Sequence, residues 1–167
     1  MSTGVTEPGG GKALEIRCIG ADLEAALAVF FEELARAGDE AVFHPHPLTA
    51  EQAVAIARRR GADLYYALVK GGEVLGYGVL RGWEEGFAIP SLGIAIAPRH
   101  RGRGLGRLLM AFLHEAARLQ GAAQVRLKVY AANTGAMNLY RRLGYVFREL
   151  GDGQLLGILD LSRPPSG

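Results

Sequence analysis

The pattern of apolar and polar positions predicts strands interspersed with amphipathic helices. Short runs rich in β-branched and aromatic residues, bounded by glycine, proline or polar residues, are typical of strands. Longer segments that repeat apolar residues every three or four positions indicate helices with one buried face. The predicted strands are 14–19, 64–69, 74–80, 91–97, 125–130, 145–150 and 154–161. The chain is therefore predicted to be an α/β (α+β) protein.

Capping residues and glycines mark where the helices begin and end. Asp22 can cap a first helix that closes near Gly38. Its apolar stripe is Leu23, Leu27, Phe30, Phe31 and Leu34. Thr49, followed three residues later by Gln52, forms a capping box for a second helix. Asn133 is the predicted cap of a short fourth helix.

A long third helix joins two predicted strands, 91–97 and 125–130. Its predicted apolar stripe is Leu105, Leu108, Leu109, Phe112, Leu113, Ala116 and Leu119, and Gly121 ends it. A helix between consecutive strands makes a β-α-β crossover, so the two strands should run parallel. The turn before the helix then lies at the carboxyl end of a strand, where ligands of open α/β sheets bind.

This turn, residues 98–107, has the composition of an anion site. Arg99, Arg101, Arg103 and Arg107 lie near a helix N-terminus, where basic side chains are unfavourable unless an anion compensates them. Its three glycines are Gly102, Gly104 and Gly106. They are expected to allow positive φ and a close approach of backbone N–H groups to a phosphate or pyrophosphate. The spacing matches neither the dinucleotide fingerprint nor the P-loop.

Two sequence blocks in the expected order resemble the GNAT superfamily of N-acetyltransferases. The turn reads R-x-x-G-x-G from Arg101 to Gly106, and the segment 133–145 follows the family pattern N-x-x-A-x-x-L-Y-x-x-x-G-[FY]. The resemblance is strong from about residue 92 to 147. It implies a GNAT fold, with a central mixed sheet of about seven strands, helices on both faces, and a splayed parallel pair formed by the fourth and fifth strands.

The resemblance also implies acetyl-CoA as co-substrate and assigns roles to individual residues. Tyr140 matches the tyrosine that returns a proton to the coenzyme sulfur, although a packing role alone is an open alternative. Asn133 matches a residue near the pantetheine arm, although a helix cap needs no further role. The cofactor-binding residues implied are Ile94, Ala95, Ile96, Arg101, Gly102, Arg103, Gly104, Leu105, Gly106, Arg107, Asn133, Ala136 and Tyr140.

The general base is where the chain departs from a common family pattern. Many members carry a glutamate on the strand before the turn, but residues 91–96 contain no carboxylate. Either water relays the proton, or the base comes from Glu84, Glu85, His44 or His46. The family's acceptor site lies near the loop after the first helix, so Phe43, His44, His46 and Trp83 are the predicted substrate-binding residues. No metal site is expected, because the two histidines have no third ligand nearby.

Composition narrows the class of protein. The chain has 167 residues, is 49% hydrophobic and has a net charge of +2, which predicts one domain at 13–162 between a disordered tail (1–12) and a frayed end (163–167). Cys18 is the only cysteine and lies in an apolar run, so it is expected to fill core space. No signal peptide or membrane-spanning run is found, so we expect a cytoplasmic protein, monomeric or homodimeric, without a nucleic-acid or membrane partner.

The function predicted is direct transfer of an acetyl group from acetyl-CoA to a primary amine, expected to be that of a small molecule. Within the same enzyme class, the alternative is a peptide or protein N-terminal acetyltransferase. Outside it, a non-catalytic acyl-CoA-binding module would keep the 101–106 turn without transferring anything. A nucleic-acid binder using Arg99 to Arg107 is a further alternative, and predicts salt-dependent binding that acetyl-CoA does not displace.

Overall fold

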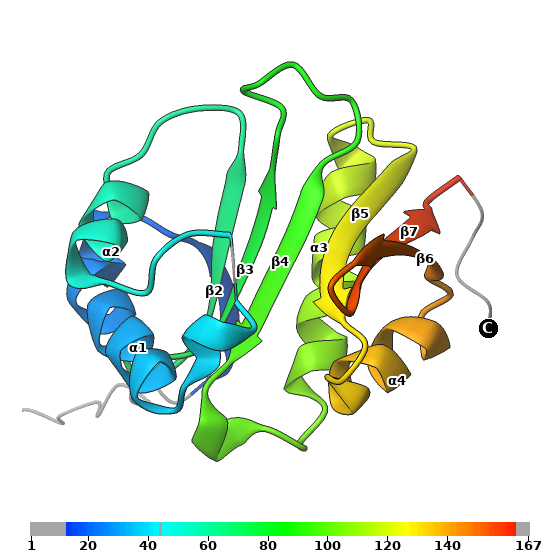
Figure 1. Ribbon diagram of the computed structural model, residues 1–167. Helices are drawn as coiled ribbons and strands as arrows, with labels where there is room; N and C mark the ends of the chain where they lie inside the picture. The colour runs from blue at the N-terminus through cyan, green and yellow to red at the C-terminus, as the bar shows by residue number, and fades with distance from the viewer. Residues whose placement is uncertain (1–12, 44, 163–167) are drawn as a thin grey trace, which may run out of the picture.

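The computed structural model describes residues 13–43 and 45–162, and these residues form a sheet of seven strands (Figure 1). The strand order is β1-β2-β3-β4-β5-β7-β6. The strands are β1 (Glu15–Cys18), β2 (Leu64–Lys70), β3 (Glu73–Arg81), β4 (Ser91–Ile96), β5 (Gln124–Tyr130), β6 (Val146–Gly151) and β7 (Gln154–Asp160). All seven predicted strands are confirmed, with ends that shift by a single residue. The predicted tails, 1–12 and 163–167, lie outside the described residues.

The sheet is mixed because one neighbouring pair, β4 and β5, runs parallel. These two strands are joined at the register pair Ser91 and Arg126, where the Arg126 N–H donates to the carbonyl of Pro90 at 3.0 Å. No other β4–β5 pair occurs among the described residues, so the strands separate toward their carboxyl ends (Figure 1). This confirms the predicted crossover and the splayed pair.

Four α-helices cover the two faces of the sheet. They are α1 (Glu24–Arg36), α2 (Ala50–Ala57), α3 (Leu105–Leu119) and α4 (Thr134–Arg142). On one face, α1 packs Phe30 and Phe31 into a core with Tyr77 and Val79 of β3. On the other, α3 packs against Leu80, Val125 and Leu127, and α4 adds Met137 and Tyr140 to this second core. No helix in the described part of the chain is long and apolar enough to cross a membrane.

Two of the three predicted helix caps are present. The Thr49 hydroxyl accepts a hydrogen bond from the Gln52 N–H at 3.1 Å, and the Asn133 side chain accepts one from the Ala136 N–H at 3.2 Å. The cap predicted at Asp22 is wrong. A short 3₁₀ turn, η1 (Ala21–Leu23), precedes α1, and the Asp22 carboxylate pairs with Arg17 of β1 at 2.5 Å instead.

The predicted core was wrong at Cys18, which is exposed near the end of β1, an edge strand of the sheet that pairs with β2 alone. The stripe predicted on α3 was also partly wrong, since Leu108 is 44% and Leu119 is 88% exposed. The buried face consists of Leu109, Met110, Leu113, His114 and Ala117. The sequence prediction placed the buried face of α3 incorrectly because it followed only apolar residues, whereas the polar His114 lies within this face.

Candidate active site

A cleft of about 1460 Å³ opens where β4 and β5 separate. Its walls are the two strands, the N-terminal turn of α3, one side of α4 and part of the loop between α1 and α2. Among the predicted cofactor residues, those that line it are Ile94, Ala95, Ile96, Arg101, Gly102, Gly104, Leu105, Gly106, Arg107, Asn133, Ala136 and Tyr140. Arg103 is the one predicted cofactor residue that does not. The splayed strands therefore bring together residues from both sequence blocks.

The turn before α3 presents backbone N–H groups to this cleft. Gly102 and Gly104 have φ of +74° and +82°, the left-handed conformation that favours glycine. Gly104 is the N-cap residue of α3, and because it has no side chain it cannot accept a hydrogen bond from the first N–H groups of the helix. No described carbonyl or side chain accepts a hydrogen bond from the N–H groups of residues 102–107. Gly106 has helical φ, contrary to the prediction. A Cβ there would make only an ordinary contact, 3.5 Å from Leu139, so neither φ nor packing requires glycine at this position. An end of a helix with free N–H groups suits an anion.

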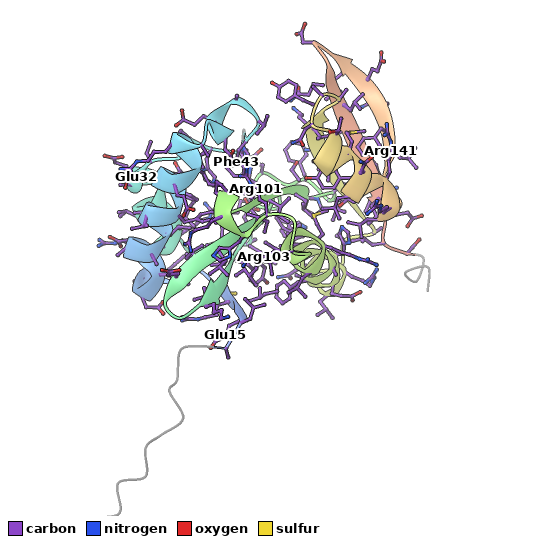
Figure 2. All side chains as sticks on the ribbon, turned by 90° about the horizontal axis from the view of Figure 1, so that it is seen from below. Glu15, Glu32, Phe43, Arg101, Arg103 and Arg141 are labelled. Atoms are coloured by element: carbon purple, nitrogen blue, oxygen red, sulfur yellow. The ribbon has the colours of Figure 1, made fainter. Side chains whose placement is uncertain are left out.

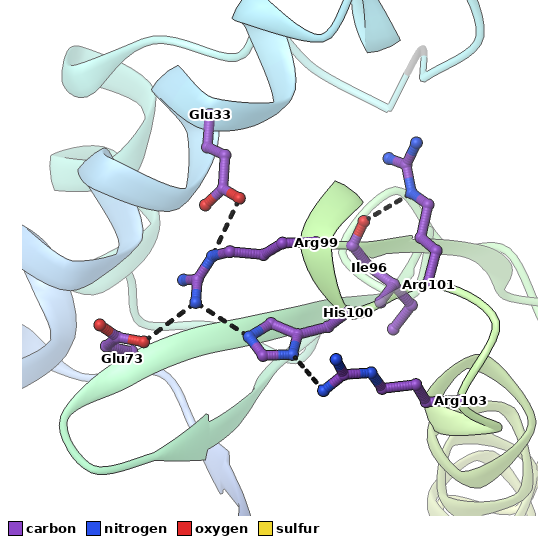
Figure 3. Close-up of polar contacts among 7 residues, drawn as sticks. All are labelled: Glu33, Glu73, Ile96, Arg99, His100, Arg101 and Arg103. Carbon is purple, nitrogen blue, oxygen red and sulfur yellow. Dashed lines mark hydrogen bonds and ion pairs between the residues drawn. The ribbon is translucent and has the colours of Figure 1, made fainter.

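The arginines of the turn do not form a single cluster (Figure 3). Arg99 pairs with Glu33 at 3.1 Å and with Glu73 at 3.2 Å, so it fastens the turn to α1 and β3. Arg101 donates to the Ile96 carbonyl at 2.9 Å and pairs with Asp39 of the 3₁₀ turn η2 (Asp39–Ala41). Figure 2, which looks at the molecule from this end, shows Arg101 and Arg103 between α1 and α4.

The arginines at 99 and 101 thus already have carboxylate partners, whereas Arg107 has none among the described residues and lines the cleft. The free charge of the turn is therefore smaller than the sequence suggested. The backbone N–H groups remain its principal feature for binding an anion.

Tyr140 is buried on the side wall formed by α4, with its ring against that of Tyr145. Burial raises the pKa of Tyr140 to about 12, so its hydroxyl is a proton donor at neutral pH. Tyr145 in turn is hydrogen-bonded to the buried His114 of α3 at 2.8 Å. These contacts hold the helix that carries Tyr140 against the helix that begins at the anion turn.

Most of the predicted base and acceptor residues do not reach the cleft. Phe43 lines it, His44 lies outside the described residues, and Trp83, Glu84 and Glu85 are not among its lining residues. Glu84 is paired with Arg59, and its hydrogen bond with that guanidinium lowers the pKa of the carboxyl group. Glu85 is exposed beside Glu84, in the turn after β3.

His46 is held in a neutral form and turned into the core. Its Nδ1 lies 2.8 Å from the Pro47 carbonyl, which can only accept, so Nδ1 donates and Nε2 accepts from the Tyr77 hydroxyl at 2.8 Å. Burial lowers the pKa of His46. His46 does not line the cleft, and among the described residues no group of three or more His, Cys, Asp or Glu side chains could hold a metal ion.

The lining residues that the sequence analysis missed include a polar group formed by Arg81, Ser91 and Arg126. They lie at the end of the cleft where β4 and β5 meet, opposite to the anion turn. Arg126 donates to the Ser91 hydroxyl at 3.0 Å, and Arg81 donates to the carbonyl of Pro45 in the α1–α2 loop. A signal was present in the strand 125–130, where the basic residues 126 and 128 alternate with valine and leucine.

The fold and the cleft define a class of acyl-coenzyme A-dependent transferases. The same fold occurs in yncA of Salmonella typhimurium, solved with its cofactor acetyl-CoA, with a TM-score of 0.71, 21% identity and coverage of 93% of this chain and 98% of that one. The model of the acetyltransferase (GNAT) family matches residues 27–145.

Two relatives agree with this match. The L-methionine sulfoximine/L-methionine sulfone acetyltransferase of Pseudomonas paraeruginosa is 33% identical over 131 residues, 75% of each chain. The streptothricin acetyltransferase of Streptomyces lavendulae is 34% identical over 85 residues, which are 50% of this chain and 44% of that protein. The chain therefore belongs to the GNAT family of acetyltransferases, and the family and enzyme class predicted from the two blocks are confirmed.

Proposed function

We propose that the protein transfers an acetyl group directly from acetyl-CoA to the primary amine of a small molecule. The observation that carries the proposal is the convergence, in one cleft, of residues 102–107 with their free N–H groups, the separated strands β4 and β5, and Tyr140. The diphosphate of the coenzyme would bind the N–H groups, and the pantetheine arm would lie between the strands. Acetyl-CoA is the co-substrate of this family, which supports the choice of donor.

In the proposed reaction, the neutral amine attacks the thioester carbonyl, the new C–N bond forms and the C–S bond breaks. Tyr140 would donate a hydrogen bond to the sulfur as negative charge develops on it. Because a pKa of about 12 lies above that of a typical thiol, roughly 8.5, the tyrosine stabilises the thiolate without giving up its proton completely. This preorganised donor would act mainly on the transition state.

The proton lost by the amine would go to water. Among the described residues that line the cleft, one carboxylate and one imidazole are found, both at the end of the anion turn: Asp39 is paired with Arg101, and the His100 Nε2 accepts a hydrogen bond from Arg99 at 2.9 Å. This proposal retains the water relay that the sequence analysis left open.

A small acceptor is favoured by the shape of the cleft at its acceptor end. The α1–α2 loop crosses β4 so closely at Gly93 that a Cβ there would lie 2.8 Å from Pro45. The loop therefore covers the strand and restricts access by a folded polypeptide. The relatives named for streptothricin and for methionine sulfoximine point the same way.

The proposal is tested by measuring thiol release from acetyl-CoA with a panel of amines, together with binding of coenzyme A by calorimetry. We expect binding of the coenzyme and turnover with at least one small amine. Binding without turnover on any amine or peptide would favour the non-catalytic module, and turnover on peptides alone would favour an N-terminal acetyltransferase.

A further inference from the structure

Arg81, Ser91 and Arg126 form a row across three adjacent strands. Ser91 of β4 is in register with Arg81 of β3 on one side and with Arg126 of β5 on the other. Residues directly opposite each other in neighbouring strands project from the same face of a sheet. Val79, two residues before Arg81, belongs to the core beneath α1, so the row lies on the face covered by α1 and the α1–α2 loop.

The two arginines of this row differ from the others in the described chain. Seven arginines pair with carboxylates: Arg17, Arg36, Arg58, Arg59, Arg99, Arg101 and Arg118. Most of the described arginines without such a partner are exposed, where water compensates the charge. Arg81 and Arg126 have no carboxylate partner among the described residues and are half-buried.

The bonds that these two side chains do make leave donors available. Arg81 gives one N–H to the Pro45 carbonyl, and Arg126 gives its Nε to Ser91 while its guanidinium lies over the Phe87 ring at 5.2 Å. The Ser91 hydroxyl accepts from Arg126, so its own proton is free to be donated. Partly desolvated guanidinium groups with open N–H positions are suited to a carboxylate, which they can bind in a bidentate manner.

The row is too far from the anion turn to serve the same ligand group. Ser91 is the first residue of β4 and Ile96 the last, a separation of roughly 17 Å at about 3.3 Å per residue, and the turn lies beyond Ile96. Asp39, a carboxylate that lines the cleft, pairs with Arg101 at the end of the cleft formed by the anion turn. The cleft therefore has a second, separate positive end.

We infer that the acceptor carries a carboxylate close to its amine, as an α-amino acid does, and that Arg81 and Arg126 bind this carboxylate with help from Ser91. The inference rests on the proposed function, because it describes the acceptor of that reaction. It also bears on the missing base. The two guanidinium groups carry two positive charges and the bound carboxylate one negative charge, so the net charge beside the acceptor is positive. A net positive charge lowers the pKa of a nearby ammonium group and so favours the neutral amine that attacks the thioester.

The test compares three forms of the same acceptor: a free amino acid, its amide, and the amine that lacks the carboxyl group. Methionine and phenylalanine, each in these forms, are assayed by thiol release with the full chain. We expect kcat/KM to be at least tenfold higher for the free amino acid than for either form that lacks the carboxylate. Arg81→Gln and Arg126→Gln should each lower kcat/KM for the amino acid roughly ten- to a hundredfold and bring the ratio between the forms close to one.

Arg60→Gln is the matched control, because Arg60 is exposed and does not line the cleft, and it should leave the ratio unchanged. A merely structural role of the two arginines would reduce activity on all three forms equally. Equal rates for the three forms in the unmodified protein would overturn this inference and leave the acetyltransferase intact. Loss of turnover with every amine, while coenzyme A still binds, would refute the proposed function itself.

Discussion

The two ends of the cleft are built in different ways. At the anion turn the available donors are backbone N–H groups of residues 102–107, where Gly102 and Gly104 have left-handed φ and line the cleft. At the opposite end the donors are the side chains of Arg81, Ser91 and Arg126, which come from three strands. A site made of backbone groups can be recognised from a motif of consecutive residues. A site made of side chains from several strands depends on how those strands are paired, which a local motif does not contain.

This difference explains which features the sequence could predict. The glycine spacing at 102–106 and the order of the two sequence blocks were enough to predict the turn, the separation of the two parallel strands and the family. The Arg81 row requires the register of β3, β4 and β5, and no local pattern contains that information. The assignment of base candidates at Glu84 and Glu85 followed the chain order of the family, but in the turn after β3 Glu84 pairs with Arg59, Glu85 is exposed, and neither lines the cleft.

Competition between polar partners explains the wrong helix cap and an ion pair that was not foreseen. Asp22 has the right residue type and place for a helix cap, yet Arg17 lies within reach and takes its carboxylate. Arg101 lines the cleft, as expected of a coenzyme-binding residue, but its ion pair with Asp39 was not foreseen. In both cases the partner is distant enough in sequence, or lies across a loop, that only the folded chain reveals it.

The largest effect should come from placing a charge at the backbone end of the cleft. Gly104→Glu puts a carboxylate beside the proposed diphosphate site, at a position with φ of +82° and open space around it. We expect the affinity for coenzyme A, measured by calorimetry, to fall at least a hundredfold, because like charges repel and the turn must adopt a strained φ.

Gly121→Glu is the control for this substitution. Gly121 has φ of +87° and is equally open, but it ends α3 on the far side from the turn. It should cost a similar amount of stability and leave coenzyme affinity unchanged. Equal loss of affinity in both variants would mean that the turn is not the diphosphate site.

A smaller effect is expected from Tyr140, which lies on the wall between the two ends. Tyr140→Phe removes the proposed donor to the sulfur and should lower kcat roughly ten- to a hundredfold, with little change in coenzyme affinity. Stopped-time thiol release and calorimetry on the same preparation separate the two quantities. Full activity would leave Tyr140 with a packing role alone.

The pair His114–Tyr145 behind this wall should make stability depend on pH. Burial lowers the pKa of His114 to about 4 from its ordinary 6.5, so the unfolded chain binds the proton more readily than the folded one. The free energy of unfolding is then highest above pH 6.5 and declines as the pH falls toward 4, by about 3 kcal/mol in all.

Urea unfolding at neutral and mildly acidic pH measures this decline, and His114→Gln should flatten it. Some slope will remain, because burial also lowers the pKa of His46. An unchanged slope in His114→Gln would show that this histidine does not set the pH dependence.

The smallest effect should distinguish two arginines of the same turn. Arg107→Gln removes a cleft-lining charge without a carboxylate partner among the described residues and should weaken coenzyme A binding a few-fold. Arg99→Gln removes a charge that is already paired with Glu33 and Glu73, outside the cleft, and should change the affinity less than twofold. The reverse order would mean that the ion pairs of Arg99 open when the ligand binds.

Within the described part of the chain, β4 and β5 share one register pair, and this has a mechanical consequence. A ligand threaded between these strands would act as a brace across the weakest seam of the sheet, tying its two halves together by hydrogen bonds that the chain itself does not make. The resistance of the protein to heat and to proteases would then rise with the concentration of coenzyme, so that its lifetime in a cell would depend on how much coenzyme is available.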